Sequence, residues 1–299
     1  MENSNNKNTE AEIDLLVIFL ELWKNKILIS AITLGFAIVS IFVALSIPNF
    51  YTSKALLAPT HQDKTLSSQL GNLSNIASIA GVGLPNNETS KSEEALERIK
   101  SYDFFTTHFL PYIELENLVA ISSWDNKKNI INYDSSIYSP ESNKWQKKYS
   151  NLQSYKQYSE ILGIIVDDKT GFITISISHM SPYISKKWVS IIVKNINESM
   201  RELDIAKAKR SIDFLNESSK TTTVQSIRDV ISRLLESQMQ TLMLASAGEA
   251  YIFKLIDSPI VPEDKSSPDR ALICIFGTFI GLIASFAVVF IRNYNTHGR

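Results

Sequence analysis

The longest apolar runs lie near the two ends of the chain. Residues 27–47 and 271–291 each comprise twenty-one residues without a charged side chain. Twenty-one helical residues span about 31 Å, which matches the roughly 30 Å hydrocarbon core of a bilayer. We therefore predict two transmembrane helices. They divide the chain into an N-terminal segment (1–26), a large domain (48–270) and a short tail (292–299).

The second apolar run follows a proline-rich segment. Pro259, Pro262 and Pro268 fall within ten residues, and proline fixes φ and lacks a donor, so we predict a stiff extended strap over 259–268. Inside the run, Gly277 and Gly281 stand four residues apart, a spacing that lets another helix approach closely. Glycine is also common in membrane spans, so a packing role and mere composition both stay open.

Alternating polarity predicts strands between the two spans. Ile161–Val166 and Phe172–Ser178 flank Asp167–Gly171, which predicts a β-hairpin with one buried face. Phe50–Ala58 and Tyr251–Ile256 have strand composition as well. Residues 93–105 fit a helix with Ser92 as its N-cap and Ala95, Leu96, Ile99 and Phe104 on the buried side.

Residues 182–247 show a helical period over an unusual length. Ser181 and Pro182 supply an N-cap and a first-turn proline, while 218–223 are poor helix formers that leave a break open. A helix over 182–216 alone would be about 52 Å long, against a diameter of about 45 Å for a compact domain of this size. We therefore predict a protruding helix whose apolar stripe is covered by copies of the same chain. The predicted subunit contacts are Ile184, Trp188, Ile192, Ile196, Ile227, Ile231 and Leu234.

The short ends predict the orientation. Lys24 and Lys26 precede the first apolar run, and Arg292 and Arg299 follow the second. Positively charged residues next to a span favour the cytoplasmic side of the membrane. We therefore predict that both termini are cytoplasmic and that the domain between the spans lies outside the cytoplasm. Apolar residues recur at helical spacing over 13–23, which predicts an interfacial helix. A cleaved signal peptide is the alternative, but the leader carries five acidic residues and its apolar core exceeds the usual 7–15 residues.

Charge and chemistry exclude several function classes. The net charge is −1, and basic and acidic residues nearly balance in the domain, so nucleic acid is not an expected partner. Cys274, the single cysteine, lies in the second span. His61, His108 and His179 are widely separated, and no Walker loop or Gly-x-Ser-x-Gly elbow occurs. We expect no metal, no cofactor and no catalytic site, and a tight turn explains Asp167 and Asp168.

The polar stretch 122–160 is rich in aromatic residues. Such rings can stack on sugars, but rings that pack on the domain from amphipathic helices and loops are the more ordinary interpretation. Both stay open, and the aromatic residues are Trp124, Tyr133, Tyr138, Trp145, Tyr149, Tyr155 and Tyr158.

Taken together, the chain resembles the Wzz-type chain-length determinants, the polysaccharide co-polymerases of bacterial inner membranes. The strongest match is the end, from Ile256-Asp257 through the proline strap into a glycine-bearing span. Leu22-Trp23-Lys24, the small-residue segment at Gly71 to Gly83, the hairpin and the long helix match as well. The short tail lacks the tyrosine-kinase domain of some relatives, which favours the kinase-free branch.

The resemblance implies an α+β membrane protein. Two transmembrane helices would flank a periplasmic domain with an α/β base and a long protruding helix. It implies homo-oligomeric rings that act with a Wzy-type polymerase on polysaccharide carried by undecaprenyl pyrophosphate, setting the modal length of O-antigen or a related lipopolysaccharide-linked glycan. A membrane-anchored periplasmic enzyme and an inner-membrane adaptor for polysaccharide export remain as alternatives.

Overall fold

The computed structural model describes residues 23–60, 90–246, 248 and 250–297, although not the side chains of 294–297. The chain divides into two compact units. One comprises Met1–Asn49 with Ser267–Arg299, and the other comprises Phe50–Ser266. The segment 66–84 and all but the last residue of the predicted helix 13–23 lie outside the described residues.

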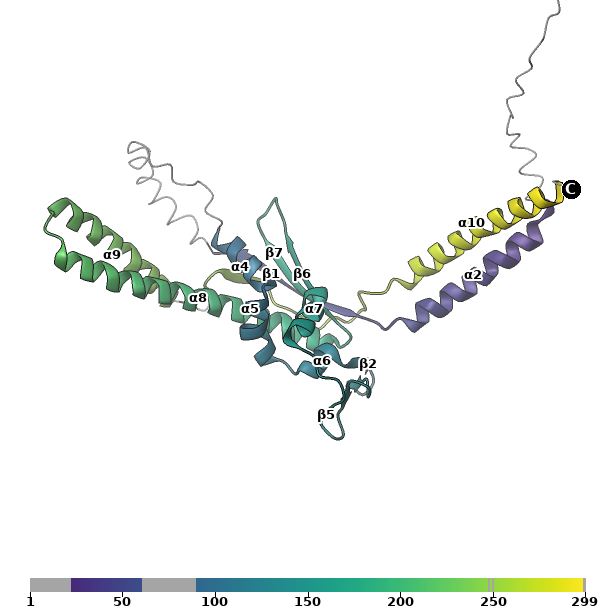
Figure 1. Cartoon of the computed structure of the whole chain (residues 1–299), viewed down its shortest axis with the longest axis horizontal. Coiled ribbons are helices and arrows are strands. Elements are labelled where there is room, and N and C mark those ends of the chain that lie inside the picture. Colours follow the sequence, from purple (N-terminus) through teal and green to yellow (C-terminus); the bar gives the residue numbers. More distant parts are fainter. Residues whose placement is uncertain (1–22, 61–89, 247, 249, 298–299) are drawn as a thin grey trace, which may run out of the picture. The chain divides into compact units, whose positions relative to one another are not determined.

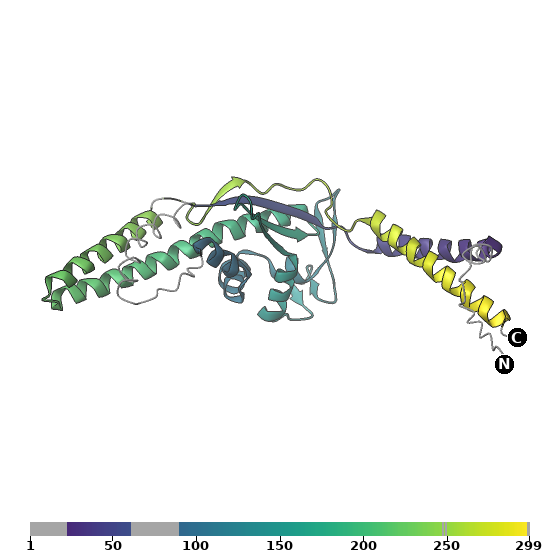
Figure 2. The same cartoon turned by 90° about the horizontal axis from the view of Figure 1, so that it is seen from above.

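The first unit consists of two apolar helices, α2 (Lys26–Ser46) and α10 (Arg270–His297), which lie side by side (Figures 1 and 2). Residues Lys26–Ser46 and Arg270–Asn293 are long and apolar enough to cross a membrane. Most of their apolar side chains are exposed, as expected of helices whose solvent is lipid. Both apolar runs therefore form the predicted helices.

The second unit is built on a four-stranded antiparallel sheet with the order β6-β7-β1-β8. Its strands are β6 (Leu162–Val166), β7 (Ile173–His179), β1 (Tyr51–Pro59) and β8 (Phe253–Asp257). Alternate residues of β7 are buried, which confirms the hairpin and its single buried face. Asp167 accepts backbone hydrogen bonds from Lys169 and Thr170 at the hairpin turn, so its role there is structural.

A helical hairpin packs on this sheet. α8 (Pro182–Thr221) crosses one face of β1 and β7, and α9 (Gln225–Ser246) turns back along α8 (Figure 1). At 1.5 Å per residue the forty residues of α8 extend about 60 Å. The helix breaks after Thr221, within the segment whose composition left a break open, and the hydroxyl of Thr222 bonds back to the carbonyl of Ser218.

Short helices cover the same side of the sheet as α8. They are α4 (Lys91–Lys100), α5 (Tyr102–Phe104), the π-helix η1 (Phe105–Phe109), the 3-10 helix η2 (Leu110–Tyr112), α6 (Leu115–Val119) and α7 (Asn151–Ile161). Ser90 caps α4 through a capping box with Glu93. The prediction of Ser92 as the cap was therefore wrong by two residues. Ser92 directly precedes Glu93, but only Ser90 has Glu93 at the third helical position.

The aromatic stretch 122–160 is mostly not helical. It forms two small hairpins, β2 (Ile121–Asp125) with β3 (Ile130–Tyr133) and β4 (Tyr138–Ser139) with β5 (Lys144–Trp145), before α7 begins. The helix expected in this stretch is α7, and the part before it forms strands instead, since pairing of short strands leaves little periodic signal. The rings of Tyr138 and Tyr158 are buried, which favours packing over sugar stacking for these two.

An aromatic cluster joins the short helices to α8. Phe109 lies 4.7 Å from Tyr158 and 5.6 Å from Trp188 between ring centroids. The hydroxyl of Tyr158 donates to the carbonyl of Ile99, which satisfies its buried polar atom. Burial raises the pKa of Tyr158, so the residue acts as a neutral core side chain. The core of this unit thus lies between the sheet, α8 and the short helices.

Candidate functional site

The two glycines of the second span face the first span. A Cβ added to Gly277 would lie 2.3 Å from the Cβ of Ser40, and one added to Gly281 would lie 2.5 Å from the Cβ of Phe36. Real Cβ contacts are never this short, so only glycine allows α10 to approach α2 this closely. The structure therefore places both residues at the contact between the chain's own two helices. Their role in coupling the spans to the domain stays a prediction.

The proline strap is fixed to the beginning of β1. Ser53 donates its hydroxyl proton to the carbonyl of Ile260 at 2.7 Å, and the N–H of Ser266 donates to the carbonyl of Phe50 at 2.8 Å. The hydroxyls of Thr52 and Ser266 are 2.7 Å apart. Both ends of the strap segment in this unit are thus bound to one strand, so movement of the strap would be transmitted directly to the sheet.

Two of the strap prolines lie in the second unit and line hollows in its surface. Pro259 is buried and lines a groove beside α8, and Pro262 lines a smaller pocket of about 170 Å³ with Trp124 and Tyr183. Pro268 belongs to the first unit. There Arg270 donates to the carbonyl of Ala44 and to the side chain of Asn49, which ties the beginning of α10 to the end of α2.

The first half of the α8 stripe does not have the role that we predicted for it. Ile184, Trp188, Ile192 and Ile196 are buried within their own chain, in the core formed with the sheet and the short helices. The prediction that they contact other subunits was wrong, because it assumed that one chain could not cover the stripe. Ile231 is also buried, on α9.

The distal part of the helical hairpin remains largely uncovered. Ile227 and Leu234 are well exposed in the single chain, so their predicted role as subunit contacts stays open. Other large apolar side chains of this region are exposed too, with Phe214 and Met243 the most exposed at 71% each. They are Phe214, Val224, Val230, Met239, Met243 and Leu244. Such an accumulation is typical of a surface that meets a partner.

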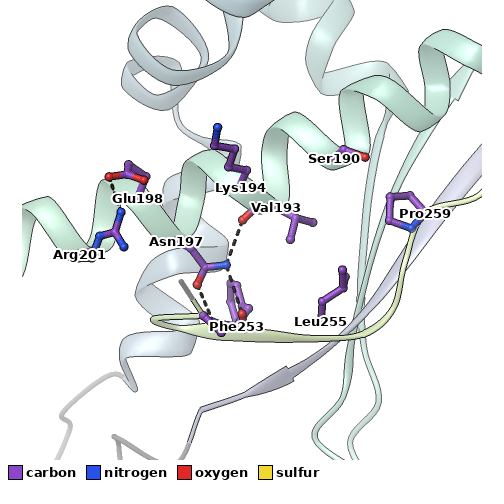
Figure 3. A pocket seen from close by; sticks show the side chains of 10 residues that line it. Ser190, Val193, Lys194, Asn197, Glu198, Arg201, Phe253, Leu255 and Pro259 are labelled. Atoms are coloured by element: carbon purple, nitrogen blue, oxygen red, sulfur yellow. Dashed lines mark hydrogen bonds and ion pairs between the residues drawn. The ribbon is translucent and has the colours of Figure 1, made fainter. Parts of the chain in front are cut away.

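A groove of about 580 Å³ runs between α8 and the outer edge of β8 (Figure 3). Its apolar floor consists of Val193, Phe253, Leu255 and Pro259. The remaining lining side chains on α8 follow helical spacing and are mostly polar: Ser190, Lys194, Asn197, Glu198 and Arg201. The groove therefore combines apolar surface, a polar rim and an edge strand.

Asn197, the first residue of an Asn-x-Ser triplet, organises this groove, although it was not among the predicted site residues. Its side-chain oxygen accepts the N–H groups of Tyr251, Ile252 and Phe253 at 3.1, 2.8 and 2.9 Å. Its amide nitrogen donates to the carbonyls of Phe253 and Val193. This buried side chain bonds to the edge of β8 where a further strand would otherwise bond (Figure 3). A polar residue next to the buried Ile196 was the available signal.

A second polar cluster fixes the chain that enters β8. Asp204 on α8 bonds the hydroxyl of Tyr251 and lies 2.6 Å from the ammonium group of Lys91 on α4. Burial and the neighbouring carboxylate raise the pKa of Tyr251, which keeps this hydroxyl a donor. Both partners bond the same carboxylate oxygen, Oδ2, of Asp204. Among the described residues no group of His, Cys, Asp and Glu could hold a metal ion.

Two family models match the chain. The model described as "Chain length determinant protein" matches residues 11–104, and the model described as "G-rich domain on putative tyrosine kinase" matches residues 221–294. Together they span more than half of the chain, including both apolar helices and β1. A search of curated proteins gives no match.

Solved structures provide two further comparisons. A "full-length bacterial polysaccharide co-polymerase" aligns with 12% identity and a TM-score of 0.39, over 95% of this chain and 98% of that one. A "Fragment of WzzB, Polysaccharide Co-polymerase from Salmonella Typhimurium" aligns with 15% identity and a TM-score of 0.28, over 73% of this chain and all of the fragment. The two family models carry the comparison: residues 11–104 form a chain length determinant domain of the Wzz type, and residues 221–294 match the G-rich domain.

Proposed function

We propose that this chain regulates the length of a bacterial surface polysaccharide as a homo-oligomeric scaffold, without making or breaking bonds itself. The match of residues 11–104 to the chain length determinant model carries the proposal. In this proposal the protein acts with a Wzy-type polymerase on glycan carried by undecaprenyl pyrophosphate, and the product is O-antigen or a related lipopolysaccharide-linked glycan. Length then depends on the geometry and dwell time of the assembly.

The proposed location is the inner membrane. α2 and α10 would cross it, both termini would be cytoplasmic, and the unit Phe50–Ser266 would be periplasmic. The positive residues next to the two spans support this orientation. The strap is the direct link between sheet and second span in the sequence, so a change at the polymerase in the membrane could reach the domain through Pro259, Pro262 and Pro268.

The non-catalytic role is supported by the polar clusters of the described residues. The groove and the Asp204 cluster use their polar atoms to bond the backbone and one another. A reacting site would instead need a base beside a nucleophile, or preorganised donors around an open position. A non-catalytic scaffold predicts that the purified protein does not phosphorylate itself with ATP.

One observation favours a second candidate. The model matching residues 221–294 is described by its occurrence on a putative tyrosine kinase. This connection fits an adaptor in polysaccharide export that works beside a separate kinase. The two candidates differ in what they control, since a length regulator changes the size distribution and an export adaptor changes the amount at the surface.

The test is the length profile of the surface polysaccharide on a silver-stained gel, with this gene deleted and then restored. The proposal predicts that a modal cluster collapses to an unregulated, short-weighted ladder and returns on complementation. An unchanged mode with less material would support the export adaptor and contradict length regulation.

A further inference from the structure

One row of side chains crosses the sheet on the face that α8 covers. Register places Val166, Ile173, Leu57 and Leu255 next to one another on β6, β7, β1 and β8. The two inner members are 2% and 0% exposed, whereas Val166 is 46% and Leu255 is 41% exposed. The apolar row thus reaches both edges of the sheet, and neither end is covered in the single chain.

Backbone groups on both edges also point outward. The N–H of Thr60 donates to the carbonyl of Ile252, so Thr60 and Ile252 are a hydrogen-bonded pair of the antiparallel ladder. Hydrogen-bonded and non-hydrogen-bonded pairs alternate along the ladder, so the peptide groups of Phe253 and Leu255 point away from β1. The side chain of Asn197 bonds both the N–H and the carbonyl of Phe253. Among the described residues, no side chain bonds the N–H or the carbonyl of Leu255. On the other edge, the N–H of Asp167 donates to the carbonyl of Phe172. By the same alternation, the peptide groups of Ile164 and Val166 on β6 point away from β7.

Strand direction makes the two edges compatible. The sheet has four strands and every neighbouring pair is antiparallel, so β6 and β8 run in opposite directions. Copies anchored in one membrane share one orientation. A neighbouring copy that brings its β6 beside β8 therefore continues the antiparallel order without turning over. Two β8 edges could pair in antiparallel fashion only about a two-fold axis, which would leave both β6 edges unpaired.

The groove beside β8 is long and apolar enough to hold this strand, which would pair with β8 only from Leu255 onward because Asn197 already bonds the peptide groups of Phe253. From Ser190 to Arg201 it follows eleven residue steps of α8, about 17 Å. The five residues of β6 extend about 17 Å as a strand. The side chains of Ile164 and Val166 would meet the apolar floor at Leu255 and Val193. Ile165, which is 67% exposed, would lie near Ile256, which is 49% exposed and stands where the register of β8 against β1 shifts.

We propose that the β8 edge of each copy binds the β6 edge of the next copy, so that the four-stranded sheets join head to tail. This inference rests on the proposed function, because it needs several copies in one membrane. The two contact surfaces differ, so the contact is heterologous and closes into a ring when its rotation closes. Pairing also explains how two exposed apolar edge strands are protected from nonspecific association.

Disulfide trapping in native membranes tests the contact. The full-length chain carries Cys274→Ser together with Ile165→Cys and either Ile256→Cys or Lys254→Cys. The Ile256 variant tests the register in which Ile165 lies opposite Ile256, and the Lys254 variant tests the register shifted by two residues. Three strand spacings, about 14 Å, separate β6 from β8 in one chain, which exceeds disulfide reach. We expect mild oxidation to give a covalent ladder for one of the two double variants.

Single variants and a matched pair define the controls. Ile165→Cys alone and Ile256→Cys alone should remain monomeric on the gel, but coexpression of the two should give a heterodimer and no higher species. Lys54→Cys with Ile165→Cys is the matched control, because Lys54 is exposed on the central strand β1. A control ladder as strong as that of the edge pair, or self-linking of Ile256→Cys alone, would overturn the head-to-tail contact.

The length profile and amine cross-linking of the same strains separate the two proposals. If the profile is regulated and amine cross-linking shows oligomers, but neither double variant forms a ladder, edge pairing is wrong while length regulation stands. If deletion leaves the profile unchanged, the proposed function fails by itself, and a ladder would still establish the contact.

Discussion

The two halves of the α8–α9 hairpin carry similar apolar stripes in different surroundings. The proximal half, from Ile184 to Met200, is buried under the sheet and the short helices of its own chain. The distal half exposes Phe214, Ile227 and Met243. Helical periodicity therefore identifies an apolar face but not what covers it. The proximal half should determine the stability of one chain, and the distal half should determine how copies meet.

The largest expected effect is at Trp188, in the proximal half. Its side chain is fully buried, so Trp188→Ala should lower the free energy of unfolding by about 3–5 kcal/mol. Phe214→Ala is the distal counterpart and should change it by about 0.5 kcal/mol or less, since Phe214 is exposed. Denaturant titration of the full-length chain in detergent measures both. Equal losses would remove the distinction between the halves.

Asn197 should produce the next largest loss. Asn197→Ala would leave buried N–H groups at the beginning of β8 without acceptors, at a cost of about 1–3 kcal/mol. Asn216→Ala is the matched control, because Asn216 lies in the distal part of α8 and belongs to a similar Asn-x-Ser triplet. The same titration distinguishes them, and a neutral Asn197→Ala would show that water replaces the amide there.

Substitution of the span glycines should have a smaller effect on packing. Gly277→Leu or Gly281→Leu must separate α10 from α2, with a loss of about 1–2 kcal/mol of helix association. Gly35→Leu on α2 is the control, since an added Cβ there meets nothing within 4 Å. Thermal unfolding in detergent provides the measurement. A loss at Gly35 as large as at Gly277 would indicate a general effect of leucine in the spans.

The smallest effect should be the pH dependence from His179. Burial lowers the pKa of this ring, and its two nitrogens bond the carbonyl of Asn117 and the N–H of Ser181. The folded state therefore resists protonation. The stability that the neutral His179 ring contributes is complete above the unfolded pKa of about 6.5. It is lost as pH falls from that value toward the lower pKa of the folded state, by up to about 1.4 kcal/mol per pH unit.

Unfolding curves between pH 5 and 8 test this, in a range chosen around that unfolded pKa of about 6.5. His179→Gln should flatten the decline below pH 6.5. An undiminished decline in His179→Gln would assign the pH dependence to another group.

The sequence predicts the elements with strong periodic signals. The two apolar helices, the β6–β7 hairpin, β1 and the long helix α8 are confirmed near their predicted boundaries. The small hairpins β2–β3 and β4–β5 were missed because their strands are short and largely polar. The cap of α4 was misplaced because two serines compete for one position.

The candidate site was less predictable than the fold. The glycines could be found because their spacing has a direct steric meaning. The groove depends on Asn197, β8 and Pro259, which are far apart in sequence and meet only through sheet order. The role of Ile184 to Ile196 was wrong for the same reason, since periodicity does not reveal that the chain supplies its own cover.

The measurement that tests the central claim most directly is the polysaccharide length profile of cells in which Gly277→Leu or Ile227→Asp replaces the native residue. Gly35→Leu serves as the control. At unchanged protein level, our account predicts a shifted or lost mode while the total number of repeat units stays the same. An unchanged mode with a lower total would contradict length regulation by a scaffold and would assign the chain to export or synthesis.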